Sequence, residues 1–295
     1  MLGFLILHYM VAEETIGCVR SVKEAVPGPK RIVIVDNASP NGSGTLLAEH
    51  FAGDGEVTVL LHEKNDGFAG GNNFGYRYIR ENEDVDYLVV MNNDAEIAVP
   101  ALEEKLDAAY RRRPFGVLGP DIYSTTFAAH QSPKRLRHYT LREVEELHAS
   151  YEKALQGGWK IRLRALVKQS FFLRRLKYQR SRRHIDPGRR YENVPLHGAC
   201  LIFSRRFMRD HEQLFHPGTF FYYETEILDS ICFHEKIRTV YEPSILVLHH
   251  QNAATDTVYR DMYQKTMFAN QNNAVSTAVF ADVLRKQEAE KAADE

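Results

Sequence analysis

Short apolar runs alternate with amphipathic stretches along the first 112 residues of the chain. The apolar runs are rich in Val, Ile and Leu, which is typical of buried parallel strands, and they cover residues 2–7, 31–35, 57–61 and 87–91. Apolar residues recur at helical spacing over residues 14–25, 44–51, 71–80 and 100–112. This pattern predicts a nucleotide-binding α/β fold, with a mostly parallel sheet and flanking helices on both faces. A later strand is expected at residues 244–248.

Polar side chains follow the end of each of the first four predicted strands. They are His8 and Tyr9, then Asp36, Asn37 and Ser39, then the glycine-rich segment 65–73, and finally Asn92, Asn93, Asp94 and Glu96. In open α/β sheets, ligands bind beyond the carboxyl ends of the strands. The sequence therefore predicts a ligand site at this edge of the sheet.

Asp94 is the central candidate for binding a metal ion. It follows a buried strand, beside Asn93 and two residues before Glu96, and carboxylates are hard oxygen ligands suited to Mg²⁺ or Mn²⁺ on a diphosphate. The alternative is a turn in which residues 92–94 only satisfy backbone groups. The polar ends of the other strands favour the metal site.

The order of these motifs resembles the family 2 glycosyltransferases of the GT-A fold, especially their rhamnosyltransferase-like branch. The resemblance rests on residues 5–9, 35–39, 65–73 and 91–94, and it spans residues 2–123 and 195–256. It implies that Asp36 reads a uracil or thymine base and that Asp94 is the metal-binding acid of a DxD-type motif. Asn92 departs from the first acid of that motif, which leaves Glu96 in the third slot.

The resemblance also implies a set of residues that bind the nucleotide-sugar donor. In it, the glycine-rich segment lies against the donor, and His197 and Gly198 form a wall near the donor sugar and the acceptor. The whole set is His8, Tyr9, Asp36, Asn37, Ser39, Asn65, Gly67, Phe68, Gly71, Asn72, Asn93, Asp94, His197 and Gly198.

Residues 219–228 resemble the acidic motif at a helix start that holds the family's general base. Thr225 separates Glu224 from Glu226, so both are candidates, and Glu226 is preferred because it directly precedes the apolar pair Ile227-Leu228. A carboxylate suits inverting transfer, since it can take the proton of the acceptor hydroxyl as that oxygen attacks the anomeric carbon. The alternative is a pair of exposed acids that the helix dipole favours.

His249 follows the predicted strand 244–248 and resembles the family's late histidine, which joins the metal or the diphosphate. The resemblance thus implies a metal set of Asp94, Glu96 and His249. The alternative reading of His249 is a structural histidine at a strand end.

Residues 134–190 are strongly basic, with 17 Lys and Arg against 5 Asp and Glu, although the whole chain carries a net charge of only −1. Trp159, Phe171 and Phe172 interleave with the basic residues, which favours basic amphipathic helices that contact an anionic membrane. The alternative is a helical pair that packs on the catalytic domain or on a second subunit. We therefore divide the chain into a donor-binding part (1–124), a basic helical insert (125–192), an acceptor and catalytic part (193–260) and a C-terminal helix with a charged tail (261–295).

Composition restricts the remaining options. The charge balance disfavours nucleic acid as a partner, and three widely spaced cysteines predict a reducing compartment. The apolar start, residues 1–10, lacks a basic lead and a cleavage site, so we expect a buried strand rather than a signal peptide. No run reaches the roughly 18 apolar residues of a membrane-spanning helix, which predicts a cytoplasmic protein at most peripherally bound to the membrane.

Together these features predict an inverting, Mn²⁺- or Mg²⁺-dependent hexosyl- or deoxyhexosyltransferase. It would use a UDP- or dTDP-sugar and a glycan or lipid-linked glycan acceptor in cell-surface polysaccharide synthesis, and a homodimer stays open. One alternative is a sugar nucleotidyltransferase, although residues 8–13 lack the glycine-rich basic loop that such enzymes carry after the first strand. The other alternative is a non-catalytic nucleotide-sugar binder, against which Asp94, Glu224, Glu226 and His249 argue together.

Overall fold

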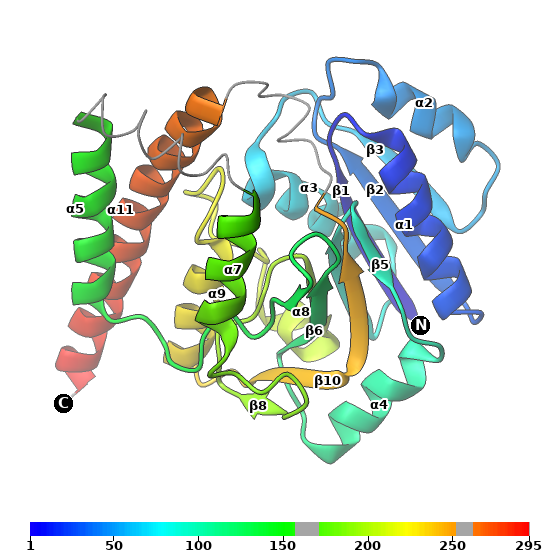
Figure 1. The fold of residues 1–295 in the computed structure, drawn as a ribbon. Helices are drawn as coiled ribbons and strands as arrows, with labels where there is room; N and C mark the ends of the chain where they lie inside the picture. The colour runs from blue at the N-terminus through cyan, green and yellow to red at the C-terminus, as the bar shows by residue number, and fades with distance from the viewer. Residues whose placement is uncertain (157–170, 252–261, 295) are drawn as a thin grey trace.

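The computed structural model describes residues 1–156, 171–251 and 262–294, and its centre is a single mixed β-sheet (Figure 1). The strands are β1 (Leu2–His8), β2 (Lys30–Asp36), β3 (Val57–Leu61), β4 (Tyr87–Asn92), β5 (Ala95–Ile97), β6 (Val117–Ser124), β7 (Ala129–His130), β8 (Tyr191–Glu192), β9 (Cys200–Ser204) and β10 (Thr239–His249). Their order is β3-β2-β1-β4-β9-β6-β10-β5, with β7 paired to β6 and β8 to β10.

The first half of the chain builds the parallel side of this sheet. Strands β3, β2, β1 and β4 run parallel, and β10 runs parallel to β6, whereas β9 is antiparallel to both of its neighbours. Most residues of β1 and β2 are buried because both faces of these strands are covered, and this is why they read as continuous apolar runs. The predicted α/β class with a mostly parallel sheet is confirmed, and each predicted strand lies at the expected place.

Helices cover both faces of the sheet. They are α1 (Ala12–Ala25), α2 (Ser43–His50), α3 (Gly67–Asn82), α4 (Leu102–Arg112), α5 (Leu141–Gln156), α7 (Phe171–Arg182), α8 (Arg205–Asp210), α9 (Glu224–His234) and α11 (Met262–Asp294). One core layer joins α1, α2 and α4 to the sheet, and the other joins α3, α8 and α9.

Two boundaries correct the sequence reading. Helix α3 begins at Gly67, four residues before the helical spacing predicted from residue 71, so residues 67–70 of the glycine-rich segment are helical as well. Two glycines of α3 serve close packing, because a Cβ at Gly71 would collide with Leu7 and one at Gly75 with Leu5 and Val35. Helix α4 begins at Leu102, so Pro100 precedes it rather than lying in its first turn.

The segment 125–192 contributes to the sheet as well as forming helices. It contains β7 and β8 in addition to α5 and α7. Helix α5 lies side by side with α11, at the left of Figure 1, and its Val144 packs with Ile227, Phe280 and Leu284. For α5, the alternative of packing on the catalytic domain is therefore the observed arrangement. Trp159 and the side chains of Phe171 and Phe172 lie outside the described residues.

Helix α11 continues to Asp294, so the charged stretch expected as a tail is helical. Within the described parts of the chain, no helix is both long enough and apolar enough to cross a membrane.

Candidate active site

The carboxyl ends of β1, β2 and β4 meet at one edge of the sheet. His8 pairs in register with Asp36, and Leu7 pairs with Asn92, so residues from three separate motifs become neighbours. This convergence follows from the parallel pairing of the strands. The predicted clustering of polar residues at this edge is what the structure shows.

His8 lies in the interior rather than in a cavity. Its side chain is fully buried, with Nδ1 2.7 Å from Thr15 Oγ1 and Nε2 2.9 Å from Ser43 Oγ. Burial lowers the pKa of His8 to about 4, so the ring is neutral near pH 7. The resemblance implies that His8 contacts the nucleotide-sugar donor. This placement does not fit such a contact, because both ring nitrogens are hydrogen-bonded to side chains of the protein itself.

The second strand end is held by internal hydrogen bonds. The Asp36 carboxylate accepts from the Ser39 backbone N–H at 3.2 Å. The Asn37 amide donates to Asn65 Oδ1 and to the Gly67 carbonyl, both at 3.0 Å. Asn37 thus connects β2 to the start of α3, and these hydrogen bonds explain why its side chain is buried.

The start of α3 is fixed against the segment that precedes α9. Gly67 has a φ of +69°, and the Phe68 backbone N–H donates to the Phe220 carbonyl at 2.8 Å. The Asn72 amide donates to the Phe68 carbonyl at 2.8 Å, while its Oδ1 is buried and has no partner among the described residues. The Phe68 side chain lines a cavity, whereas Asn72 lies beneath it.

Asp94 and His249 lie together although 155 positions separate them in the chain. His249 Nε2 is 3.3 Å from Asp94 Oδ1, and both side chains are buried. His249 Nδ1 is 2.7 Å from Gln131 Oε1, so an Nδ1–H that donates to this amide leaves the Nε2 lone pair facing the carboxylate. A cation between the two would resolve that repulsion, and metal-binding histidines commonly donate their other ring N–H to a protein oxygen in this way.

Glu96 lies apart from this pair. Its carboxylate is 3.0 Å from His250 Nε2, and the His250 backbone N–H donates to the Asp94 carbonyl at 3.0 Å. Residues 93–96 and His250 border a cavity of about 340 Å³ against α1. Across the described residues, no group of three or more His, Cys, Asp or Glu side chains is arranged to hold a metal ion. The structure therefore joins Asp94 with His249 but not with Glu96.

A larger cavity of about 440 Å³ opens beside α9. Aromatic side chains dominate its wall, together with the two candidate glutamates and a lysine; the lining residues are Phe68, Asn92, Lys134, Tyr139, His197, Gly198, Ala199, Phe221, Tyr222, Tyr223, Glu224, Thr225, Glu226 and Asn273. His197 connects this cavity to the pair of Asp94 and His249, since its ring centroid lies 5.8 Å from that of His249. His197 and Gly198 thus lie in the wall of this cavity.

The two glutamates at the start of α9 have different surroundings. Glu226 Oε1 is 2.7 Å from Lys134 Nζ, and its Oε2 accepts from Thr225 Oγ1 at 3.0 Å. Glu224 Oε1 is buried and has no hydrogen-bond partner in the described residues. Burial, followed by the nearby Glu226 charge, raises the pKa of Glu224 to about 7. Glu224 thus differs from Glu226 in having a carboxylate oxygen without a partner in the described residues.

Sequence reasoning missed the residues that complete this site from the segment after β7. Gln131 orients His249, and Lys134 binds Glu226, yet each contact joins positions more than 90 residues apart. Neither residue belongs to a recognisable motif. The aromatic residues 220–223 directly precede the glutamates of the acidic motif. Their position could have indicated a cavity wall, but aromatic residues are equally typical of a buried core segment.

The family comparison is decisive about the class of protein. A model of "Glycosyl transferase family 2" matches residues 4–232. The chain belongs to glycosyl transferase family 2. The match includes the strand ends, Asp94, both glutamates and the segment 134–198, but not His249. No curated protein matches the chain in a sequence search.

Two solved structures are similar to this chain in fold. Residues 1–349 of S. aureus TarS, in complex with UDP, match with a TM-score of 0.52 and 11% identity, over 97% of this chain and 70% of that one. The mannosyltransferase PcManGT from Pyrobaculum calidifontis, in complex with GDP-Man and Mn²⁺, matches with a TM-score of 0.50 and 12% identity, over 100% of this chain and 75% of that one. These similarities place the family 2 enzyme in the GT-A fold.

Proposed function

We propose that this family 2 enzyme is an inverting glycosyltransferase that moves a sugar from a UDP- or dTDP-sugar to a hydroxyl of a glycan or lipid-linked glycan. The observation that carries the proposal is the buried Glu224 carboxylate, whose Oε1 has no hydrogen-bond partner among the described residues, in a cavity that His197 links to Asp94 and His249. A general base in the cavity and acidic and imidazole ligands next to His197 of its wall suit displacement at an anomeric carbon.

Glu224 is the proposed general base, which reverses the preference for Glu226 drawn from the sequence. A proton acceptor needs an oxygen that no other group occupies, and both Glu226 oxygens are bound. A pKa of about 7 also lies near the operating pH, where a general base is both ionised and basic enough to work well.

Asp94 and His249 are the proposed protein ligands of Mn²⁺ or Mg²⁺. Only two protein side chains are needed if diphosphate oxygens and water complete the coordination, which is how Mg²⁺ is commonly bound. The bound metal would neutralise charge on the leaving diphosphate. The Mn²⁺ and GDP-Man bound to the mannosyltransferase, and the UDP bound to TarS, support a nucleotide diphosphate donor and a divalent ion.

Of the residues that the sequence predicts to contact the nucleotide-sugar donor, we retain mainly those whose side chains are not fully buried. Tyr9, Ser39, Asn65 and Asn93 are only partly buried at the strand ends, and Phe68 lines the cavity, whereas His8, Asn37 and Asn72 support the fold. Asp36 is also buried, but its carboxylate can accept more than the bond from the Ser39 N–H, and it stays a proposed contact to the nucleobase. The rhamnosyltransferase-like branch, and hence a deoxyhexose donor, is proposed on the motif resemblance alone.

The aromatic wall of the cavity favours a saccharide acceptor. Tyr222 and Tyr223 line the cavity together with Glu224, and tyrosine rings can offer apolar surface to the C–H face of a pyranose together with a polar hydroxyl. A role in cell-surface polysaccharide synthesis, at the cytoplasmic face of the membrane, is proposed from the exposed basic side chains of α7, among them Arg175, Lys177 and Arg180.

Ligand-dependent thermal unfolding with UDP-, dTDP- and GDP-sugars, with and without Mn²⁺, followed by transfer assays, tests the proposal. A donor that binds only the folded protein raises Tm with the logarithm of its excess over Kd. We expect Asp94→Ala to remove the Mn²⁺-dependent part of the shift, whereas Asp282→Ala, exposed on α11, leaves it intact. Failure of every nucleotide sugar to stabilise the wild type and to act as a donor would refute the proposal.

A further inference from the structure

Lys134 reaches the acidic start of α9 from the irregular segment that follows β7. Its Nζ is 2.7 Å from Glu226 Oε1 and donates to Thr225 Oγ1 at 3.0 Å. The Lys134 side chain is 31% exposed while that of Glu226 is 10% exposed, so the pair lies at the cavity wall rather than on the outer surface. An ion pair in this setting is less screened than a surface pair.

The backbone of Lys134 is held from two sides. Its N–H donates to the Pro195 carbonyl at 2.8 Å, two residues before His197. Its carbonyl accepts from Arg182 Nη1 on α7 at 2.6 Å. Lys134 is thus fixed between the wall segment of the cavity and a helix of the basic segment.

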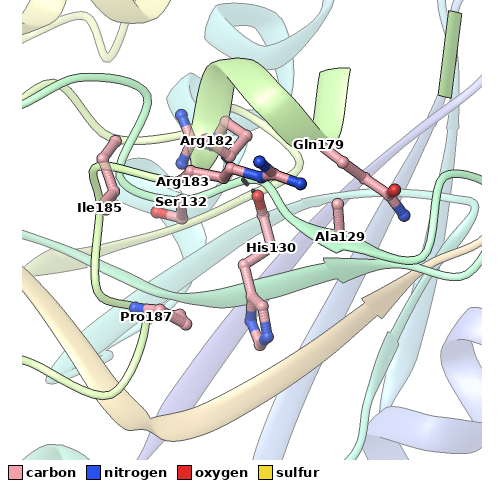
Figure 2. A pocket seen from close by; sticks show the side chains of 8 residues that line it. All are labelled: Ala129, His130, Ser132, Gln179, Arg182, Arg183, Ile185 and Pro187. Carbon is pink, nitrogen blue, oxygen red and sulfur yellow. Dashed lines mark hydrogen bonds between the residues drawn. The ribbon is translucent and has the colours of Figure 1, made fainter. Parts of the chain in front are cut away.

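Arg182 organises the whole turn that presents Lys134. Figure 2 shows it beside His130 at a small cavity of about 190 Å³, where Arg182 Nε donates to the His130 carbonyl at 3.2 Å. The same guanidinium donates to the Pro133 carbonyl. Three carbonyls of residues 130–134 therefore share one planar cation, which restricts where the Lys134 side chain can point.

We propose that Lys134 is a positioning residue of the transfer reaction: it binds Glu226 and thereby leaves Glu224 as the carboxylate that accepts the proton. The inference rests on the proposed function, which supplies the reaction. In that reaction, the acceptor hydroxyl oxygen forms a bond to the anomeric carbon while the bond from that carbon to the diphosphate oxygen breaks. The hydroxyl proton moves to Glu224, and the nucleoside diphosphate leaves with the electron pair.

The charges that face Glu224 come from several elements and act in opposite directions. Glu226, on its own helix, raises the pKa of Glu224, and Lys134 lowers it, both in addition to the larger effect of burial. His197 in the cavity wall is held neutral, since burial lowers its pKa well below the usual range. The other titratable groups that line the cavity are the phenols of Tyr139, Tyr222 and Tyr223. Among the charged residues of the cavity, Lys134 is thus the cation that offsets Glu226.

Two substitutions around this ion pair should shift the acidic limb of the pH–rate profile in opposite directions. Lys134→Met removes the cation and leaves Glu226 unpaired, so the midpoint should rise by about one pH unit. Glu226→Gln removes the neighbouring anion, so the midpoint should fall. Lys134→Arg keeps the charge and should restore the wild-type midpoint. The matched control is Lys153→Met, an exposed lysine on α5, which should change nothing.

The experiment measures kcat against pH for these variants and follows the Glu224 carboxyl by ¹³C NMR, assigned through its loss in Glu224→Gln. A Lys134→Met enzyme with an unchanged midpoint, or midpoints that move in the same direction in Lys134→Met and Glu226→Gln, overturns the inference. If the wild type transfers no sugar, the proposed function fails. The NMR titration then decides the inference separately: an upward shift in Lys134→Met supports it, and no shift overturns it.

Discussion

The chemistry of the site depends on how two glutamates, two residues apart, are distinguished. Neighbours occupy the oxygens of Glu226, whereas Glu224 is buried without a partner on Oε1. Leaving a buried carboxylate unpaired costs stability, and such costs are typical of residues kept for catalysis. Sequence spacing alone could not make this distinction, because Lys134 approaches from 92 positions away.

Glu224→Gln should lower kcat by about 10² to 10⁴ while the Kd for donor stays near the wild-type value. The amide keeps the shape of the side chain but cannot accept the proton. Initial rates and donor titration by calorimetry measure the two quantities. A Glu224→Gln enzyme that transfers sugar at the wild-type rate would exclude Glu224 as the base.

The same substitution should stabilise the protein at alkaline pH. The pKa of Glu224 is about 7 in the folded state against an ordinary value of 4.5, so the folded state binds the proton more tightly and stability falls as pH rises from about 4.5 to about 7. At pH 8 the ionised group costs on the order of 3 kcal/mol, which Glu224→Gln should remove. Chemical unfolding at pH 8 and pH 5 measures the difference, which should be small at pH 5. Glu152→Gln, exposed on α5, is the control and should have little effect at either pH.

At the scale of elements, the strands and the polar residues after them were predictable because they are local patterns. Apolar runs define β1, β2, β3 and β4, and parallel pairing then brings their ends together. Helix α3 was predicted, but its start was placed four residues late, at residue 71 instead of Gly67, since glycines that permit close helix packing resemble glycines of a loop in sequence. The contacts of Gln131 with His249 and of Arg182 with residues 130–134 were unpredictable, because they depend on tertiary placement of a segment with no motif.

Gly67→Ala should destabilise the junction between α3 and the segment before α9 by more than about 1 kcal/mol. Gly67 has a φ of +69°, and an added Cβ would collide with the Phe220 carbonyl that binds the Phe68 N–H. Gly17→Ala is the matched control, because that glycine lies in α1 with nothing near its Cβ position and should gain about 0.5–1 kcal/mol. Urea unfolding measures both. Equal effects of the two substitutions would show that the Gly67 contact is not required.

At the scale of the whole molecule, the basic segment does two different things. Helix α5 uses its apolar side against α11, and Arg182 of α7 points inward to the carbonyls of residues 130–134. The exposed side of α7 then retains Arg175, Lys177 and Arg180, which have no structural role of this kind. Because Arg182 holds α7 against residues 130–134, the exposed basic side chains of the same helix would form an outer surface at a fixed position relative to the cavity.

That outer surface should bind anionic membranes. Each basic residue near such a surface contributes on the order of 1 kcal/mol, so the double substitution Arg175→Glu and Arg180→Glu should weaken binding to anionic vesicles by at least about 10²-fold. Co-sedimentation with anionic and neutral vesicles, at low and high salt, measures the effect, because attraction between exposed charges is screened by salt. The matched control, Arg111→Glu with Arg112→Glu, changes two exposed arginines at the end of α4 and should retain binding. Equal loss in the control would indicate a response to net charge alone, and a wild-type protein that ignores anionic vesicles at low salt would rule out membrane docking through α7.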